Sequence, residues 1–378
     1  MNPPTPPELP PSAPLLPAPP PLPAEKAAAP GGSDDLAIRL VDAFQQKLNT
    51  IRKQVAQVIV GQDRVLDEIL IALLAGGHVL VEGVPGLAKT LIVSSVSRAL
   101  TLQFGRIQFT PDLMPADVTG TQVITENPTT RERQFSFRRG PVFVNLLLAD
   151  EINRASPKTQ AALLEAMQEG NVTVGGARHT LERPFMVLAT QNPIEQEGTY
   201  RLPEAQLDRF LLKIIVDYPS HDDERGIIER TTGTLRGTVS PVIDREEILA
   251  LQRIVRALRV SNHIVEYATR IVRASRPGEE GAASWVDDLV AWGAGPRATQ
   301  ALVLAAKART LMSGRFAVTR AAVRDVARPV LRHRVLPNFR AEAEGLGADD
   351  IVGRLVDEAP FFEPREGFDD VTRAILGI

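Results

Sequence analysis

The most informative part of this sequence is Gly83-Val84-Pro85-Gly86-Leu87-Ala88-Lys89-Thr90. An apolar run at 78–81 precedes it, and a helix-forming segment follows from Leu91. Glycine at two loop positions lets backbone N–H groups turn inward around phosphates without an obstructing Cβ. Lys89 supplies a positive charge for those phosphates, and the Thr90 hydroxyl is a ligand suited to Mg²⁺. The pattern therefore predicts a strand, a phosphate-binding loop and a helix whose N-terminus faces the ligand.

Ala88 is the one departure from the general phosphate-loop pattern, because a glycine is usual at that position. The simplest alternative is a glycine-rich turn that only joins a strand to a helix. The Lys-Thr pair at the correct spacing favours nucleotide binding over that turn. We expect ATP or ADP, with Mg²⁺, to contact the whole loop and the first helical residue: Gly83, Val84, Pro85, Gly86, Leu87, Ala88, Lys89, Thr90 and Leu91.

A second motif begins with the apolar run 142–149, which is typical of a strand buried on both faces and ends in Asp150-Glu151. In open α/β sheets, ligands bind at the carboxyl ends of the strands. Asp150 is expected to hold Mg²⁺ and Glu151 to polarise the attacking water. The pair alone could be the solvated start of a helix. It indicates an ATPase only in combination with the phosphate loop.

Two further candidates lie downstream. The apolar run 185–190 is followed by Asn192, which could position the lytic water or contact the γ-phosphate, or could be an ordinary turn residue before proline. Arg209 precedes another apolar run and is the candidate arginine finger, with Arg201 as second choice. The alternative for Arg209 is a surface ion pair with Asp208. As catalytic residues the sequence thus proposes Lys89, Glu151, Asn192 and Arg209.

The order of these motifs resembles the AAA+ ATPase superfamily, and the finer strings resemble its MoxR family. The strings are 83–90, 106–120, 149–154, 158–169, 189–193 and 204–210, within a similarity that runs from about Val58 to Arg334. Ala88 is usual in that family. The resemblance implies an α/β fold: a P-loop NTPase core with a parallel sheet in an αβα sandwich, followed by a small all-α lid domain.

The resemblance also implies further site residues and partners. Val60, Gly61 and Gln62 match the segment that lines the adenine pocket, and Arg297 matches a second sensor that reaches the phosphates from the lid. It implies a homo-oligomeric ring with a hexamer as the expected size, and a protein client, sometimes together with a von Willebrand factor A domain protein. The client and that partner come from the resemblance alone.

Composition excludes several other classes. The chain has 378 residues, 44% of them hydrophobic, so it can bury a large core. With no cysteine and five scattered histidines, it offers no disulfide, thiolate or histidine metal site. The net charge of −3 makes nucleic acid an unlikely ligand. No apolar run suggests a membrane span and no signal peptide is recognisable, so we expect a cytoplasmic protein.

Composition shifts divide the chain. Residues 1–34 are rich in proline and alanine and predict a disordered tail. Residues 35–220 are expected to form the nucleotide-binding core, with strands near 78–82, 106–109, 143–149, 185–190 and 211–217. Two inserted hairpins are expected, at 117–140 and 172–181. Residues 221–378 are expected to form the helical lid.

Together these observations predict an ATPase that hydrolyses ATP to ADP and phosphate and remodels or matures a protein client. Two other functions stay open. One is an AAA+ motor acting on nucleic acid, and the other is a nucleotide-gated scaffold with little hydrolysis.

Overall fold

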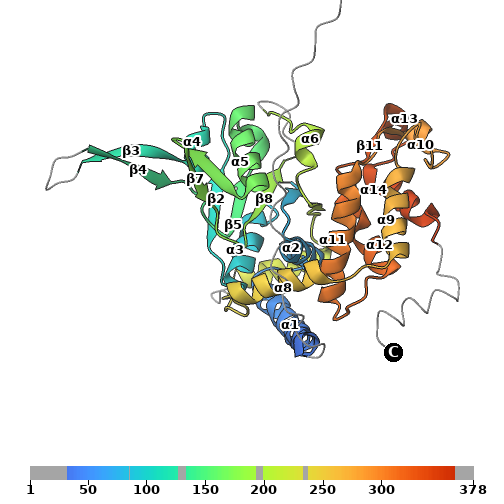
Figure 1. Cartoon of the computed structure of the whole chain (residues 1–378), viewed down its shortest axis with the longest axis horizontal. Coiled ribbons are helices and arrows are strands. Elements are labelled where there is room, and N and C mark those ends of the chain that lie inside the picture. The colour runs from blue at the N-terminus through green and yellow to red at the C-terminus, as the bar shows by residue number, and fades with distance from the viewer. Residues whose placement is uncertain (1–31, 85, 127–132, 193–198, 233–236, 362–378) are drawn as a thin grey trace, which may run out of the picture.

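A computed structural model describes residues 32–84, 86–126, 133–192, 199–232 and 237–361 (Figure 1). The N-terminal part contains, in chain order, α1 (Gly32–Ala56), α2 (Asp63–Ala75), β1 (Val79–Glu82), α3 (Lys89–Ala99), β2 (Phe104–Gln108), α4 (Pro115–Thr119), β3 (Gly120–Glu126), β4 (Arg133–Arg139), β5 (Leu146–Asp150), the 3-10 turn η1 (Ile152–Arg154), α5 (Pro157–Glu169), β6 (Asn171–Val174), β7 (Ala177–Thr180), β8 (Met186–Gln191), α6 (Glu204–Leu207), β9 (Leu212–Ile215) and α7 (His221–Thr231). The C-terminal part contains α8 (Arg245–Ala257), α9 (Asn262–Ala274), α10 (Val286–Leu289), β10 (Val290–Trp292), α11 (Pro296–Met312), α12 (Arg320–Leu331), β11 (Leu336–Pro337), α13 (Phe339–Ala343) and α14 (Ala348–Glu358).

The central sheet has five parallel strands in the order β2-β5-β8-β1-β9, so the five predicted strands are confirmed. Because all five run in one direction, every carboxyl end lies at the same edge of the sheet. Strand β1 sits between β8 and β9, with Val79 opposite both Leu188 and Leu212. The phosphate loop, which follows β1, therefore leaves the sheet beside the ends of β5 and β8.

Alternate residues of the strands belong to two separate hydrophobic clusters, one on each face of the sheet. In β5, Leu146 and Leu148 pack in the cluster that contains α2 and α3, whereas Leu147 and Ala149 pack in the cluster that contains α5. All four side chains are fully buried. A strand covered on both faces needs apolar residues at every position, which explains the unbroken run in the sequence.

Both predicted hairpins are present as antiparallel pairs, β3 with β4 and β6 with β7. The β3–β4 ribbon extends far from the body, at the left of Figure 1. Near its base, the Phe137 ring stacks on His179 of β7 with ring centroids 3.8 Å apart. Farther out, the directly opposed pair Ile124 and Phe135 is 62% and 68% exposed. The ribbon therefore has an apolar pair with no core behind it among the described residues.

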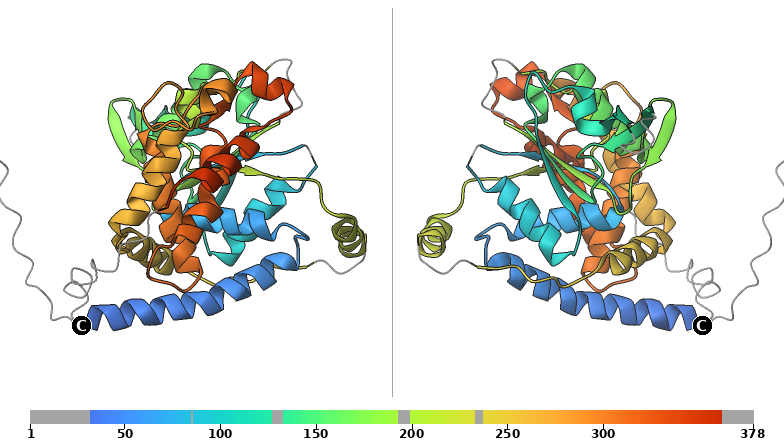
Figure 2. Two further views of the ribbon diagram at one scale, coloured as in Figure 1. Left: turned by 90° about the vertical axis from the view of Figure 1, so that its right-hand side faces the viewer. Right: turned by 90° about the vertical axis from the view of Figure 1, so that its left-hand side faces the viewer.

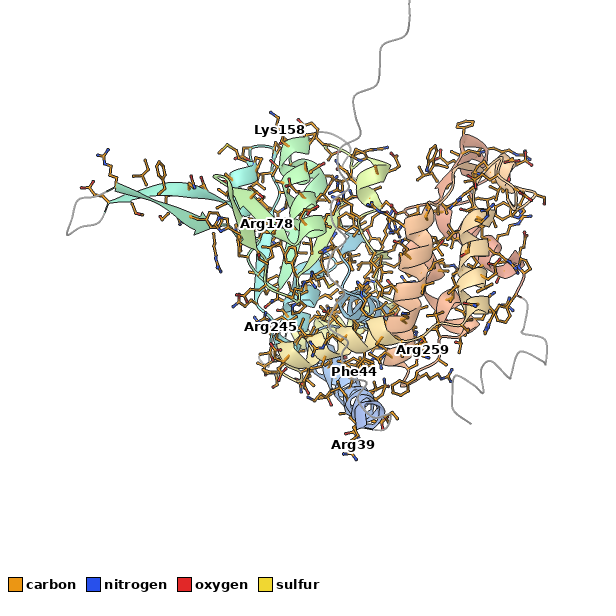
Figure 3. The ribbon with its side chains drawn as sticks, viewed as in Figure 1. Arg39, Phe44, Lys158, Arg178, Arg245 and Arg259 are labelled. Carbon is orange, nitrogen blue, oxygen red and sulfur yellow. The ribbon has the colours of Figure 1, made fainter. Side chains whose placement is uncertain are left out.

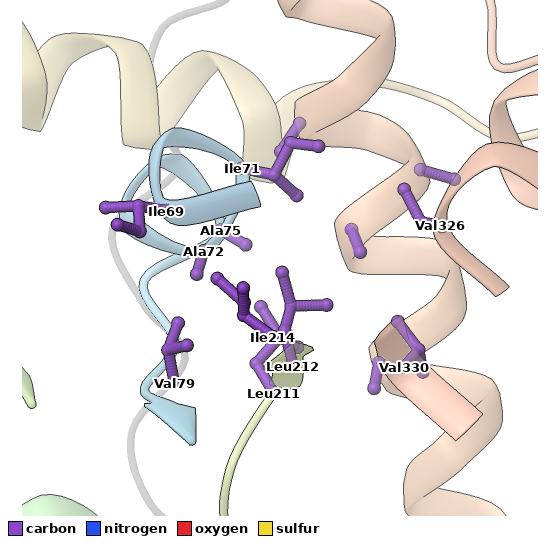
Figure 4. Packing of buried hydrophobic residues seen from close by; sticks show 14 of the residues in the cluster. Ile69, Ile71, Ala72, Ala75, Val79, Leu211, Leu212, Ile214, Val326 and Val330 are labelled. Atoms are coloured by element: carbon purple, nitrogen blue, oxygen red, sulfur yellow. The ribbon is translucent and has the colours of Figure 1, made fainter. Parts of the chain in front are cut away.

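The C-terminal helices form a lid that packs against β9 and α2. Figure 4 shows Val326 and Val330 of α12 facing Leu212 and Ile214 of β9. Pro329 does not break α12, which continues to Leu331. Among the described residues, no helix is long and apolar enough to cross a membrane.

Some boundaries differ from the prediction. Helix α1, which lies along the bottom of Figure 2, begins at Gly32, inside the segment expected to be a tail. The remainder of that segment, residues 1–31, lies outside the described residues, as does the tip of the first hairpin, 127–132. Helix α14 was not predicted, and it packs against α9 and α12. The three predicted domain ranges stay a prediction.

Candidate nucleotide-binding site

The loop between β1 and α3 has the backbone that a phosphate cradle requires. A Cβ on Gly83 would lie 2.8 Å from the carbonyl oxygen of Val216, so no larger residue fits there. Gly86 has φ +88°, in the region that favours glycine, and open space surrounds its Cα. Ala88 also has a positive φ, 52°, immediately before α3. Pro85 lies outside the described residues.

Lys89 begins α3 and folds back over the loop. Its Nζ donates to the carbonyl oxygen of Gly83 at 2.6 Å and to that of Val84 at 3.4 Å. Burial lowers the pKa of Lys89, while the nearby carboxylates of Asp150, Glu151 and Glu82 act in the opposite direction. The lysine thus lies within the electrostatic reach of both acidic residues of the second motif. Thr90 is half-buried in the same helical turn.

Asp150 and Glu151 are held by a third residue, Thr190 at the end of β8. The Thr190 hydroxyl donates to Asp150 Oδ1 at 2.6 Å and accepts a hydrogen bond from the Glu151 N–H at 2.8 Å. Thr190 is 1% exposed, so this junction is protected from water. The sequence reasoning missed it, although a threonine ending an otherwise apolar strand was a visible signal.

Two residues of β2 also bond the acidic pair, and neither was predicted from the sequence. Arg106 donates to Asp150 Oδ2 from Nη2 at 2.7 Å and from Nε at 3.2 Å. Gln108 Nε2 donates to Glu151 Oε2 at 2.8 Å. On the far side, Arg154 Nε lies 3.3 Å from Glu151 Oε2. The Glu151 carboxylate is therefore oriented by neighbours rather than free in solvent.

Backbone strain is concentrated here. Of the described non-glycine residues, three have a positive φ, and two of them are Ala88 and Glu151, at 52° and 57°. A left-handed backbone costs a non-glycine residue on the order of 1–3 kcal/mol and persists only where the surroundings enforce it. The strain therefore marks the two turns that bring the loop and the acidic pair together.

The residues present fit a magnesium nucleotide. Carboxylate and hydroxyl oxygens are the protein ligands that Mg²⁺ prefers, and Asp150 and Thr90 supply one of each at the same sheet edge. The loop offers a helix N-terminus and an ammonium group to phosphates. Within the described part of the chain, Lys89 is bonded to backbone carbonyls of its own loop and to no carboxylate, so phosphate oxygens can replace those partners without opening an ion pair.

Asn192 and the segment Val60-Gly61-Gln62 lie around this centre. Asn192 is buried just beyond the carboxyl end of β8. Gly61 has φ +73°, and a Cβ there would lie 2.3 Å from Cγ of Asp223 in α7. The segment thus sits close to the turn that follows β9, which also leaves the sheet at its carboxyl edge. Leu91 is 42% exposed on α3.

Arg209 and Arg297 lie at the opposite edge. Leu211 N donates to His78 O, just before β1 begins, and the four residues of β1 then span about 13 Å to the loop. Arg209 Nη1 donates to Leu164 O of α5 at 2.9 Å, and Arg297 Nη1 lies 3.7 Å from Asp208 Oδ2. The structure thus does not bring Arg297 to its own phosphate loop, because the lid docks beside the amino ends of β1 and β9. Arg201, the second finger candidate, is exposed in the segment before α6.

Comparison with family models gives two matches. Residues 78–212 match the model described as "ATPase family associated with various cellular activities (AAA)", and residues 282–355 match "AAA lid domain". The first range holds the phosphate loop, Asp150, Glu151, Asn192 and Arg209, and the second holds Arg297.

Comparison with whole proteins gives relatives over most of the chain. The chain is 43% identical to "Chaperone MoxR1" of Mycobacterium tuberculosis, with 87% of this chain and 85% of the relative covered. It is 30% identical to "Protein MoxR" of Methylorubrum extorquens, with 75% and 85% covered. A crystal structure from Cytophaga hutchinsonii, described as a candidate ATPase, superposes with a TM-score of 0.79 at 36% identity, covering 88% of this chain and all of the other. With this fold, these motifs and these relatives, the chain belongs to the MoxR family of AAA+ ATPases.

Proposed function

We propose that this chain binds ATP with Mg²⁺, hydrolyses it to ADP and phosphate within a homo-oligomeric ring, and uses the cycle to remodel a protein client. The observation that carries the proposal is the convergence at one sheet edge of Lys89, Asp150 and Glu151. Lys89 begins α3, whereas Asp150 and Glu151 are consecutive residues at the end of β5, yet Lys89 lies within electrostatic reach of both carboxylates. The Thr190 hydroxyl from β8 bonds both acidic residues.

Each residue has a role that follows from its position. Gly83 to Leu91 cradle the phosphates, Thr90 and Asp150 hold the metal, and Glu151 polarises the attacking water. Bound Mg²⁺ would supply positive charge that offsets the negative charge developing on the phosphates. Asn192, beside Thr190 at the end of β8, is placed to position the water or the γ-phosphate. Val60, Gly61 and Gln62 flank the adenine.

The ring follows from the position of Arg209. Since Arg209 lies at the amino edge of the sheet, it cannot reach the loop of its own subunit without refolding β9. A guanidinium on that edge can instead contact the nucleotide of a neighbouring copy, where it stabilises transition-state charge. Arg297 lies on the same edge, so we assign it to the neighbour's nucleotide as well. A hexamer is the size that the family resemblance implies.

The β3–β4 ribbon is the candidate contact for a client. It projects from the body and exposes the apolar pair Ile124 and Phe135, which suits an unfolded or apolar peptide segment better than a phosphate backbone. The relative from Mycobacterium tuberculosis is named as a chaperone, which agrees with this assignment. A von Willebrand factor A domain protein stays a candidate partner on the resemblance alone.

ATP turnover over a protein dilution series, with the assembled mass measured at each concentration, tests the proposal. Turnover per subunit should rise with assembly. Glu151→Gln should bind ATP with parent affinity and turn it over at least about a hundredfold more slowly, as expected when a general base is removed. Absence of turnover in assembled parent would instead support the nucleotide-gated scaffold.

A further inference from the structure

Three consecutive lid residues, Arg332, His333 and Arg334, are buried against the strand segment that carries Arg209. They follow α12 directly and are 6%, 4% and 7% exposed. Charged side chains are rarely buried to this degree unless they are paired or fully hydrogen-bonded. Their partners therefore indicate what the burial accomplishes.

Many of the partners are main-chain carbonyls of β9 and the residues just before it, while Arg332 also pairs with Asp349 and Arg334 also donates to Val330 O, both within the lid. Arg334 donates from Nη2 to Phe210 O at 2.7 Å and to Asp208 O at 3.3 Å, and from Nη1 to Leu211 O at 3.2 Å. His333 Nε2 lies 3.1 Å from Phe210 O, and Arg332 Nη1 donates to Lys213 O at 3.2 Å. Strand β9 is an edge strand that pairs with β1 on one side only, so its outward-facing carbonyls have no strand to bond them. We call Arg332, His333 and Arg334 the lid clamp.

Two carboxylates reinforce the clamp. Asp349 of α14 accepts from Arg332 Nε and Nη2 at 2.9 Å each. Asp208 accepts from Arg334 Nε at 2.7 Å and lies 3.7 Å from Arg297 Nη1, at the start of α11. Asp208 thereby ties two lid helices to one position of the core. His333 is neutral, because burial and the charges of Arg334, Lys213 and Arg332 hold its pKa well below the usual range.

The described bonds of the lid clamp do not include the Arg209 side chain. Residues 208, 210 and 211 are held by carbonyl contacts, whereas the Arg209 guanidinium points away and rests on Leu164 O of α5 through one bond of 2.9 Å. A hydrogen bond to a carbonyl is only weakly stabilising once competition from water is counted, so the side chain can leave α5 while its backbone stays fixed. The finger therefore has a rigid base and a movable tip.

We infer that the lid clamp is a positioning device for Arg209, so that the lid of one subunit sets the approach of that subunit's finger to the neighbour's nucleotide. The inference rests on the proposed function, in which Arg209 acts between subunits. Arg332, His333 and Arg334 touch no nucleotide here; they act through the backbone of residues 208–213. Lid movement in one subunit would thus change the position of Arg209 in the next subunit's active site and not in its own.

The contacts are concentrated where this role requires them. Arg324 of α12 serves as the comparison. It donates to Val356 O at 3.0 Å and pairs with Asp357, both in α14. Those contacts hold α12 to the rest of the lid, not to the core. Simple adhesion of lid to core would not need three adjacent donors aimed at the residues that flank a finger.

Mixed rings of two variants separate a role in the neighbour's site from a general structural role. Arg209→Ala subunits keep a complete phosphate site but supply no finger, and Lys89→Ala subunits supply a finger but bind no nucleotide. Mixed before assembly, the two should restore ATP turnover that neither shows alone. Arg334→Gln is then added to one partner at a time.

Placed in the Lys89→Ala subunit, Arg334→Gln should reduce the restored turnover at least about tenfold, whereas in the Arg209→Ala subunit it should change it less than about twofold. Arg324→Gln in the Lys89→Ala subunit is the matched control and should leave turnover intact. If Arg334→Gln folds poorly, Asp208→Asn replaces it, because this change removes a half-buried carboxylate and keeps the guanidinium. It should likewise reduce turnover in the Lys89→Ala subunit and not in the Arg209→Ala subunit.

Equal loss in both placements, or loss in neither, overturns the inference, because the clamp would then act within one subunit or not at all. If Arg209→Ala and Lys89→Ala fail to restore turnover without a clamp substitution, the shared active site is wrong. In that case the proposed function and the inference fall together.

Discussion

At the carboxyl edge of the central sheet, acidic side chains and a glycine-rich loop are held by side-chain hydrogen bonds and strained turns; at the amino edge, buried guanidinium groups grip the main chain. The first edge contains Lys89, whose described bonds go to carbonyls of its own loop that phosphate oxygens can replace, beside the acidic pair Asp150 and Glu151. The second contains Arg334, which is bonded to Asp208 and to several carbonyls. The carboxyl edge is thus suited to exchanging hydrogen-bond partners, and the amino edge to keeping them.

A change at the carboxyl edge should abolish function in the same subunit, and Lys89→Ala is the largest such effect. It removes the ammonium that would contact the phosphates, so ATP affinity should fall at least about a hundredfold and turnover with it. Binding of a fluorescent ATP analogue to the isolated variant measures this directly. The variant should still fold with the parent's melting temperature, because the described hydrogen bonds of Lys89 go to its own loop. Parent-like ATP affinity would contradict the assignment of the loop.

A change at the amino edge should spare binding and remove turnover. Arg209→Ala should keep parent ATP affinity and lose about a thousandfold in turnover, as expected for an arginine finger. Arg201→Ala is the matched control and should retain most of the activity, because Arg209 and not Arg201 is carried by the clamped segment. The reverse ranking of the two variants would move the finger to Arg201.

The smallest effect concerns Glu68 on α2, which lies near the clamp. Its side chain is 10% exposed and Oε2 has no hydrogen-bond partner in the described part of the chain. Burial raises the pKa of Glu68 to about 7, against the attraction of Arg64 and Arg332 and in the same direction as Asp349 and Asp67. A raised acid pKa means that the folded state holds the proton longer, so stability falls as pH rises from about 4.5 through 7.

Glu68→Gln removes that titration and should raise the melting temperature by a few degrees at pH 8, with no gain at pH 4.5. Asp67→Asn, on the same helix, loses the bidentate pair with Arg52 and should lower it at pH 8. Thermal unfolding of both variants at the two pH values makes the test. An equal gain for Glu68→Gln at both would show that the buried charge is not the cause.

The sequence predicted the fold and the carboxyl edge well because both depend on local patterns. Strands β1, β5 and β8 are short apolar runs, and Lys89, Asp150 and Glu151 each follow directly from the end of a strand or loop. Parallel pairing then brings those ends to one edge whatever the detailed register. The roles of these residues in binding and hydrolysis remain predictions.

The amino edge could not be predicted, because the contacts of the lid clamp with the core join residues more than a hundred positions apart. Arg334 meets Asp208 only after the lid has docked on β9, and Arg297 was assigned to its own phosphates because a family motif fixes a residue type but not a docking direction. Arg324 of α12 shows the same limit, because it pairs with Asp357 of α14, a helix that the sequence pattern did not reveal.

The hydroxyl of Thr190 has a mechanical consequence. It bonds Asp150 and Glu151 at once, so the spacing of the two acidic residues is set by β8 as well as by their own strand. Asn192 extends from the same end of β8. These three polar groups therefore cannot drift apart gradually as the protein warms. Inactivation should coincide with separation of β5 from β8, and the catalytic geometry should survive for as long as the sheet itself is whole.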